Sequence, residues 1–325
     1  MSDIIYKLFN KIQNGEWDTI SQIGKKRSID LADRYPRLIA SHWYERRYGP
    51  GIDVIGRDWD NLILLDACRY DYFKSQIDLN GELESVISQG NYSWEFMKEN
   101  FAGRELHDTM YITANPYAER LPEDTFFSIE TCLDQWDEQI GTVFPEEVNS
   151  KAIEAYNKYP NKRLIIHYMQ PHQPHIGQTA DAIRERIDIK GWDRYHGDPL
   201  KSAERTGVPQ WSPVRSGKIP ESKIQQAYAE SLDIVLQNVS KLIESIEGRT
   251  VISADHGEML GERGVLQKRY GHPRDINNHA LRKVPWFVIN SDQRRNITTG
   301  NPIKSERISG DVVDSRLSAL GYESD

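Results

Sequence analysis

The sequence TVISADHGE, at residues 250–258, is the stretch that indicates the fold most strongly. Its apolar half, Thr250 to Ala254, is typical of a strand buried on both faces of a sheet. Asp255 and His256 follow directly, and Gly257 permits a sharp bend that could turn both side chains toward one ion. In open α/β sheets, ligands bind beyond the carboxyl ends of the strands. The stretch therefore predicts a buried strand that ends at a functional site.

Other short apolar runs extend this pattern along the chain. Further buried strands are predicted at residues 62–65, 164–169 and 284–289, with a weaker candidate at 108–113. Between them lie helical patterns, the clearest at residues 222–246. Its apolar stripe consists of Ile224, Tyr228, Leu232, Val235, Val239, Leu242 and Ile246. Alternating strands and helices predict an α/β fold, a three-layer α/β/α sandwich with a mostly parallel central sheet.

We expect a single domain over residues 1–325, with two additions. Residues 1–57 are helical in pattern and precede the first core strand, so we interpret them as an N-terminal extension. Residues 176–220 are polar and rich in glycine and proline, which is typical of an inserted cap or loop region. Aromatic and basic residues of this cap could stack on a substrate or pair with anions, although charged loop residues are usually only solvated. They are Trp192, Trp211, Arg184, Arg186, Arg194 and Arg205.

Composition excludes some classes of protein. With 38% hydrophobic and 28% charged residues in 325, the chain has an ordinary globular composition. A net charge of -8 argues against a surface devoted to nucleic acid or anionic lipid, which needs clustered basic residues. The two cysteines form no Cys-x-x-Cys pair, and no stretch reads as a signal peptide or membrane span. We expect a cytoplasmic protein with neither a nucleic-acid partner nor a membrane span.

Three predicted strands end in polar residues that could meet at one edge of the sheet. Asp66 follows the first strand, the segment QPHQPH at 170–175 follows another, and Asp255 with His256 follows a third. A carboxylate at a strand end is often only a helix N-cap, and an isolated Asp-His pair is common. Their coincidence, together with His272 further on, favours a metal site.

With these residues in place, the chain resembles the alkaline phosphatase and sulfatase superfamily. The resemblance spans about residues 60–290. It rests on Asp66 with Arg69 and Asp71, on ADHGEMLGE at 254–262, on HYMQPHQPH at 167–175, and on Gly271-His272 followed by LRKVP at 281–285.

The resemblance implies a role for each matching residue. Asp66, Asp255 and His256 match metal ligands, and His272 matches a late histidine that completes the site in many members. His172 matches a residue that either binds a second metal or contacts the ester oxygens of the substrate. Two-zinc members have an aspartate where His172 stands, so the resemblance leaves a second metal site open.

The family nucleophile is a Thr, a Ser or a formylglycine made from Cys, at the start of a helix. Cys68 lacks the Cys-x-Pro-x-Arg context of that modification, so Ser93, ahead of a helical run ending near Phe101, is the candidate. Free N–H groups and the helix dipole there would favour an alkoxide and an incoming phosphate. The alternative is that Ser93 is only an N-cap.

Several further polar residues have weaker signals. Asn115 resembles an asparagine that binds a phosphate oxygen in some phosphodiesterases, so we expect it, with His172, to bind substrate; it is equally typical of a turn before Pro116. Arg69 and Asp71 are expected to pair with each other or to cap the next helix. His167, His175 and His279 are interpreted as supporting or structural residues.

The sequence thus predicts a metal-dependent hydrolase or transferase that acts on phosphate mono- or diesters through a metal-activated Ser93. The expected partner is a small-molecule or glycan-linked phosphate or sulfate ester. Mixed carboxylate and imidazole ligands favour zinc or manganese, with magnesium or calcium as alternatives. Two other hypotheses stay open: a sulfatase-type hydrolase, made less favourable by the missing formylglycine motif, and a catalytically inactive binding member of the fold.

Overall fold

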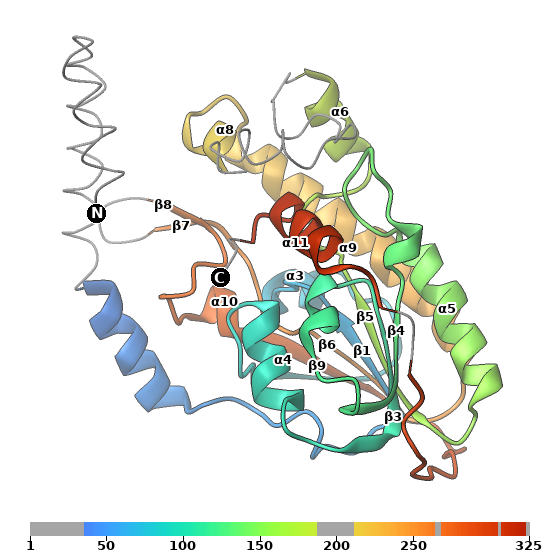
Figure 1. The fold of residues 1–325 in the computed structure, drawn as a ribbon. Coiled ribbons are helices and arrows are strands. Elements are labelled where there is room, and N and C mark those ends of the chain that lie inside the picture. The colour runs from blue at the N-terminus through green and yellow to red at the C-terminus, as the bar shows by residue number, and fades with distance from the viewer. Residues whose placement is uncertain (1–35, 187–210, 264–267, 305–306, 323–325) are drawn as a thin grey trace.

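A seven-stranded sheet forms the centre of the molecule (Figure 1). The computed structural model describes residues 36–186, 211–263, 268–304 and 307–322. The sheet consists of β1 (Asn61–Leu65), β2 (Glu82–Ile87), β3 (Leu106–Thr113), β4 (Phe126–Thr131), β5 (Arg163–Tyr168), β6 (Thr250–Ser253) and β9 (Lys283–Ile289), in the order β2-β9-β6-β1-β5-β3-β4. A separate antiparallel hairpin joins β7 (Met259–Arg263) to β8 (Lys268–Gly271).

The sheet is parallel except at one strand. β1 lies between β5 and β6 and runs parallel to both, and β3 runs parallel to β5 and β4. Only β9 is reversed within this sheet, pairing antiparallel with β6 and β2. All five residues of β1 are buried, as expected for a central parallel strand. The predicted α/β class with a mostly parallel sheet is confirmed.

Helices cover both faces of the sheet. Successive residues of β5 point to opposite faces. Tyr168 donates a 2.5 Å hydrogen bond to Asn149 of α5 (Pro145–Lys158), whereas His167 stacks on Tyr111, which packs on Phe101 of α4 (Ser93–Phe101). The long α9 (Glu221–Ile243) packs beside α5. Other described helices are α3 (Tyr70–Gln76), η1 (Pro116–Arg120), η2 (Leu133–Gln135), α6 (Gln178–Arg186), α8 (Ser212–Arg215), α10 (His279–Arg282) and α11 (Gly310–Ala319).

Two strands of the sheet were not predicted. β2 is a mostly exposed edge strand, with Glu82 and Glu84 facing solvent, so it lacks the apolar run that marks a buried strand. β4 forms the opposite edge, where two phenylalanines are followed by polar residues. Edge strands are stabilised on one side only, so their sequences carry a weaker signal than central strands.

The two predicted additions are described in part. Residues 36–48 of the N-terminal extension form a helix whose Tyr44 is buried beside His279, and residues 1–35 lie outside the described residues. In the cap, Trp211 is buried against Tyr270, and Arg184 donates to the backbone oxygen of His175. Outside the described part lie Trp192, Arg194 and Arg205, together with the side chain of Arg186.

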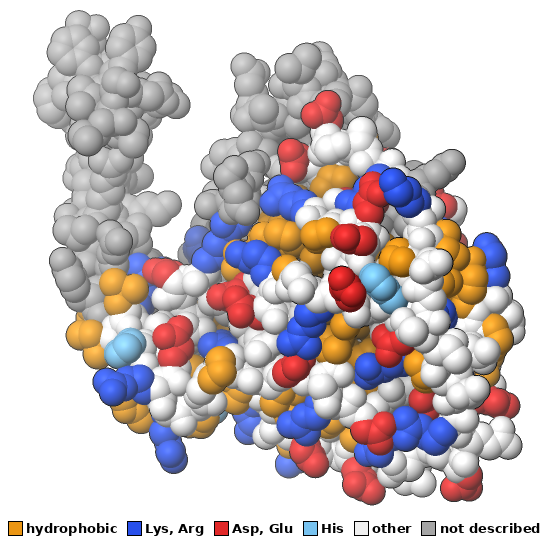
Figure 2. Space-filling view, turned by 60° about the horizontal axis from the view of Figure 1, so that its bottom comes forward, with side chains coloured by type: hydrophobic (Ala, Val, Ile, Leu, Met, Phe, Trp, Pro, Cys, Tyr) orange, Lys and Arg blue, Asp and Glu red, His pale blue; other side chains and the backbone are white. Residues whose placement is uncertain are grey.

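The surface carries both signs of charge. Figure 2 shows one face of the molecule, on which basic and acidic side chains are interspersed with polar and apolar ones. Such a mixture is ordinary for a chain with 41 basic and 49 acidic residues. Among the described helices, none has both the length and the apolar character needed to cross a bilayer.

Candidate active site

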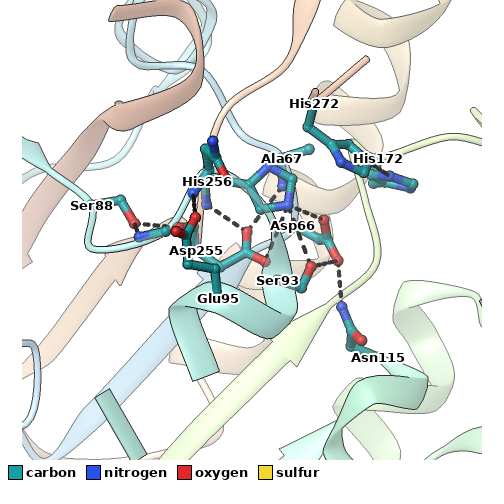
Figure 3. A network of polar contacts seen from close by, with 12 residues as sticks. Asp66, Ala67, Ser88, Ser93, Glu95, Asn115, His172, Asp255, His256 and His272 are labelled. Carbon is teal, nitrogen blue, oxygen red and sulfur yellow. Dashed lines mark hydrogen bonds and ion pairs between the residues drawn. The ribbon is translucent and has the colours of Figure 1, made fainter. Parts of the chain in front are cut away.

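The ends of β1 and β6 bring the two predicted aspartates together (Figure 3). Asp66 follows β1, and Asp255 follows β6 by two residues. The turn after β1 places Ala67 at φ 59°, and its N–H donates to Asp255 Oδ1 at 3.1 Å. Left-handed backbone is uncommon outside glycine, and it often marks a functional turn. One turn therefore fixes both carboxylates relative to each other.

Gly257 is required after His256 because the backbone there packs closely on another segment, and not because of the bend expected from the sequence. A Cβ atom at Gly257 would lie 2.1 Å from the backbone oxygen of Ala280. The Gly257 N–H also donates to the Leu281 oxygen at 2.7 Å. The backbone after His256 thus packs directly on α10, where only glycine fits.

Each of the two aspartates presents one oxygen without a hydrogen-bond partner. Asp66 Oδ1 and Asp255 Oδ2 are buried and accept no hydrogen bond from any described residue. His256 Nε2 lies 3.4 Å from the first and 3.5 Å from the second. Buried carboxylate oxygens normally have partners, so unpaired ones facing an imidazole fit a bound cation.

His256 has the orientation of a metal ligand. Its Nδ1–H donates to the Gly257 oxygen at 2.8 Å, which directs Nε2 toward the two carboxylates. Burial lowers the pKa of His256, but the carboxylates of Asp255 and Asp66 outweigh burial and raise it to about 10. A positive charge is thus favoured at Nε2, and a divalent ion would supply it in place of the proton.

His167 also belongs to this group, although the sequence suggested only a supporting role. Its Nε2 lies 3.6 Å from Asp255 Oδ2, and Nδ1 lies 2.8 Å from the Tyr111 hydroxyl. Asp66, Asp255 and His167 each place one potential ligand atom within 4.8 Å of the others. The buried position of His167 on β5, beside β1, could not be distinguished from a core position in the sequence.

Ser93 lies in the centre of this group. It is the first residue of α4 and is fully buried. Its Oγ donates to Asp66 Oδ2 at 3.2 Å and lies 3.3 Å from His256 Nε2. Tyr92 is the N-cap residue, and the described contacts give Ser93 no capping hydrogen bond. The hydroxyl is therefore directed at the carboxylates and not at the helix backbone.

Asn115 has the turn position considered from the sequence, and its side chain also contacts Asp66. It is the N-cap of η1, where its Oδ1 accepts from the Tyr117 N–H at 3.0 Å. Its Nδ2 donates to Asp66 Oδ2 at 2.7 Å. Asn115 thus holds the same Asp66 oxygen that receives the Ser93 hydroxyl.

His172 and His272 lie beside this first group (Figure 3). With Glu258 they form a second group of potential ligands. The two histidine Nε2 atoms are 3.0 Å apart, and His172 Nδ1 donates to the Gln173 oxygen at 2.5 Å. His172 Nε2 is then the acceptor in the neutral ring, and His272 must donate to it. Burial lowers the pKa of both imidazoles, which favours these neutral forms.

Glu258 follows the Asp255-His256 pair closely, and the sequence indicated no role for it. It is fully buried, and neither carboxyl oxygen has a hydrogen-bond partner among the described residues. Burial raises its pKa to about 8. An unpartnered buried carboxyl two residues after His256 is a candidate ligand for a second cation with His172 and His272.

Arg69 and Asp71 form a bidentate ion pair, as expected, with N–O distances of 2.9 and 2.7 Å, and Arg69 also pairs with Glu262. Tyr322 was not anticipated at all. Its hydroxyl lies 3.0 Å from Ser93 Oγ, and its ring stacks on His172.

The fold is similar to several solved structures, although a scan of protein-family models and a search of curated proteins found no match. The zinc complex of the C-terminal periplasmic domain of EcEptC from Escherichia coli is 14% identical, with 74% of this chain and 76% of that chain covered and a TM-score of 0.46. The C-terminal periplasmic domain of phosphoethanolamine transferase EptC from Campylobacter jejuni is 14% identical, with coverage of 71% and 78% and a TM-score of 0.41. A protein in the alkaline phosphatase superfamily from Vibrio parahaemolyticus is 15% identical, with coverage of 82% and 67% and a TM-score of 0.39.

These similarities concern the fold alone. They agree with the alkaline-phosphatase-like fold that the sequence motifs predicted. They also contradict the cytoplasmic location expected from the sequence, because two of these structures are periplasmic domains. That expectation is wrong. It rested on low cysteine content and on the N-terminal residues, and neither property defines one compartment.

Proposed function

We propose that this protein is a metal-dependent hydrolase or transferase that acts on phosphate esters, with Ser93 as the nucleophile. The position of the Ser93 hydroxyl carries the proposal. It lies at the start of α4, between Asp66 Oδ2 and His256 Nε2, and next to two buried carboxylate oxygens without partners. A buried serine that served only to pack or to cap a helix would not need this charged surrounding.

Asp66, Asp255 and His256 would hold the metal, with His167 Nε2 as a neighbouring donor. When bound, a divalent ion would lower the pKa of the Ser93 hydroxyl and offset negative charge on the substrate. The mixed carboxylate and imidazole donors favour zinc or manganese. His272 lies with His172 and Glu258, so we assign it to the leaving-group side or to a second cation rather than to the first set.

The proton and bond changes follow from the contacts of Ser93. Its hydroxyl proton leaves toward Asp66 Oδ2, the acceptor of its hydrogen bond. The Ser93 oxygen forms a bond to phosphorus as the bond to the leaving oxygen breaks, and the leaving oxygen departs with its negative charge on the side of His272, whose Nε2–H can donate a hydrogen bond to it. Water or an acceptor hydroxyl then cleaves the seryl ester and restores Ser93.

Other residues hold these groups in position. Asn115 Nδ2 fixes Asp66 Oδ2, and the turn at Ala67 fixes Asp255. Free backbone N–H groups in the first turn of α4 are available to the non-bridging oxygens of the ester. Such preorganised donors stabilise charge that develops in the transition state.

The test is hydrolysis of p-nitrophenyl phosphate, bis-p-nitrophenyl phosphate and p-nitrophenyl sulfate by the metal-reconstituted protein. We expect turnover of a phosphate ester, and a loss of roughly a thousandfold or more in both Ser93→Ala and Asp255→Asn. Ser150→Ala and Asp233→Asn change exposed residues of α5 and α9 and serve as matched controls.

Other results of this assay would favour one of the alternative functions. Selective turnover of the sulfate ester would identify a sulfatase-type enzyme. No turnover with zinc, manganese, magnesium or calcium, despite stoichiometric metal binding, would favour an inactive member of the fold. Turnover that survives Ser93→Ala would remove Ser93 from the mechanism.

A further inference from the structure

Tyr322 seals the site from the side of the last described helix. Its hydroxyl lies 3.0 Å from Ser93 Oγ. Its ring stacks on His172 at 5.4 Å between centroids, lies 4.9 Å from His272, and meets Tyr117 edge-on at 4.8 Å. Tyr322 therefore contacts the proposed nucleophile and both histidines of the second group at once.

A defined backbone turn directs Tyr322 inward. The N–H of Tyr322 donates to the Leu317 oxygen, and the N–H of Gly321 donates to the Ser318 oxygen. Gly321 has φ 87°, in the region where glycine is free of strain. This pattern is the Schellman motif that ends many helices. The sequence Leu320-Gly321-Tyr322 thus ends α11 and turns the next side chain toward Ser93.

The helix before this turn is held by packing. Val313, Leu317 and Leu320 are buried in the main core, and Arg120 pairs with Asp314 at 2.9 Å. α11 also packs against η1, which follows the β3 strand end. The contacts that hold this segment in place therefore lie in α11, whereas Tyr322 lies beyond the helix, directly after Gly321. Movement about Gly321 would shift Tyr322 without unpacking α11.

The Ser93 oxygen has no free direction for an incoming ester. A hydroxyl oxygen carries one hydrogen and two lone pairs besides its carbon. Asp66, His256 and Tyr322 occupy all three directions, and Ser93 and His172 are at most 1% exposed. Asp66 and His256 are fixed by the turns after β1 and β6. Tyr322 is the partner that can leave.

We propose that Tyr322 is an intramolecular gate, which occupies the ester-binding side of Ser93 and must swing away before substrate binds. The proposal rests on the proposed function for the identity of the ligand, but the closed gate itself is independent of turnover. If the open state is a minor population, of about 10% or less, substrate binds with an apparent affinity reduced by that fraction.

The experiment compares the full chain with Tyr322→Ala, without metal, by carbethoxylation with diethyl pyrocarbonate and peptide mass spectrometry. Removal of the ring is expected to raise the modification rate of the buried His172 about tenfold, the factor set by the closed fraction, and that of the partly exposed His272 by less. Tyr159→Ala removes a ring that packs on Phe127, away from the site, and should leave both rates unchanged.

A second variant keeps the tyrosine side chain. Gly321→Ala strains the turn at φ 87° and should also release Tyr322 and raise the His172 rate. With p-nitrophenyl phosphate and bound metal, Tyr322→Ala should lower KM by a similar factor and preserve kcat.

Unchanged modification of His172 in both variants would overturn the gate, whatever the activity. A large fall in kcat for Tyr322→Ala would also overturn it, because Tyr322 would then assist the reaction. If His172 becomes reactive but no ester is cleaved, the gate stands and the proposed function fails.

Discussion

Glu258 makes the stability of the metal-free protein depend on pH. Its folded pKa of about 8 lies above the ordinary 4.5, so the folded state binds this proton more tightly than the unfolded chain. The stabilisation is complete below pH 4.5 and is lost as pH rises through 8, by up to about 5 kcal/mol. His256, raised from 6.5 to about 10, loses its contribution over a higher window.

We predict that Glu258→Gln removes the loss of stability that ionisation of Glu258 causes. The free energy of urea unfolding, measured with chelator at pH 4.5 and pH 8, should fall less with pH in Glu258→Gln than in the wild type. Glu84→Gln, at an exposed position of β2, is the control. An equal fall in wild type and Glu258→Gln would mean that Glu258 ionises normally in the folded protein.

Strand ends allowed part of the site to be predicted from sequence. Asp66 and the Asp255-His256 pair each follow an apolar run directly, so their meeting followed from a parallel sheet. The partners of His272 could not be predicted, because they depend on the path of the β7–β8 hairpin. The sequence gives no indication of a role for Glu258 beyond its place in the segment 254–262, because its lack of hydrogen-bond partners is a property of the folded interior.

At the scale of elements, the loop before α4 sets the position of Ser93. A Cβ atom on Gly90 would lie 2.4 Å from the backbone nitrogen of Phe96, so loop and helix touch backbone to backbone. We predict that Gly90→Ala destabilises the protein by about 1–3 kcal/mol and also lowers turnover, because α4 must shift. Denaturant unfolding and ester hydrolysis measure the two effects.

Gly310→Ala is the matched control for this prediction. Gly310 begins α11, and a Cβ atom there would meet no heavy atom within 4 Å. Alanine in a helix is favoured over glycine, so this variant should be neutral or slightly more stable. A Gly90→Ala variant as stable as Gly310→Ala would show that the loop before α4 adapts freely.

Central elements were easier to predict than edge elements. β1, β5, β6 and β9 have continuous apolar runs because both faces are covered, and all four were predicted. The reversal of β9 has no signature in its side chains, since a strand reads alike in either direction. The turn that places Tyr322 had a signal, Leu-Gly-Tyr, but its target lies far away in sequence.

For the whole molecule, metal binding should stabilise the fold, because the proposed ligands come from segments that are joined only in the folded state. Zinc at about 100 times its Kd should add about 2.7 kcal/mol to the free energy of unfolding. We predict a corresponding rise in Tm for the wild type, measured by calorimetry, and none for Asp66→Asn with Asp255→Asn. Asp233→Asn is the control, and an equal rise in the double variant would place the metal elsewhere.

The position of β1 at the centre of the sheet also determines the order in which its neighbouring strands can pair with it during synthesis. Its Asn61 hydrogen-bonds to Thr250, 189 positions later in the chain. A nascent chain can pair β1 with β5 early, but the β6 side of this fully buried strand stays open until residue 250 has been made. Asp66 and Ser93 are thus synthesised long before Asp255 and His256. The proposed metal site can therefore be completed only after most of the chain has been synthesised.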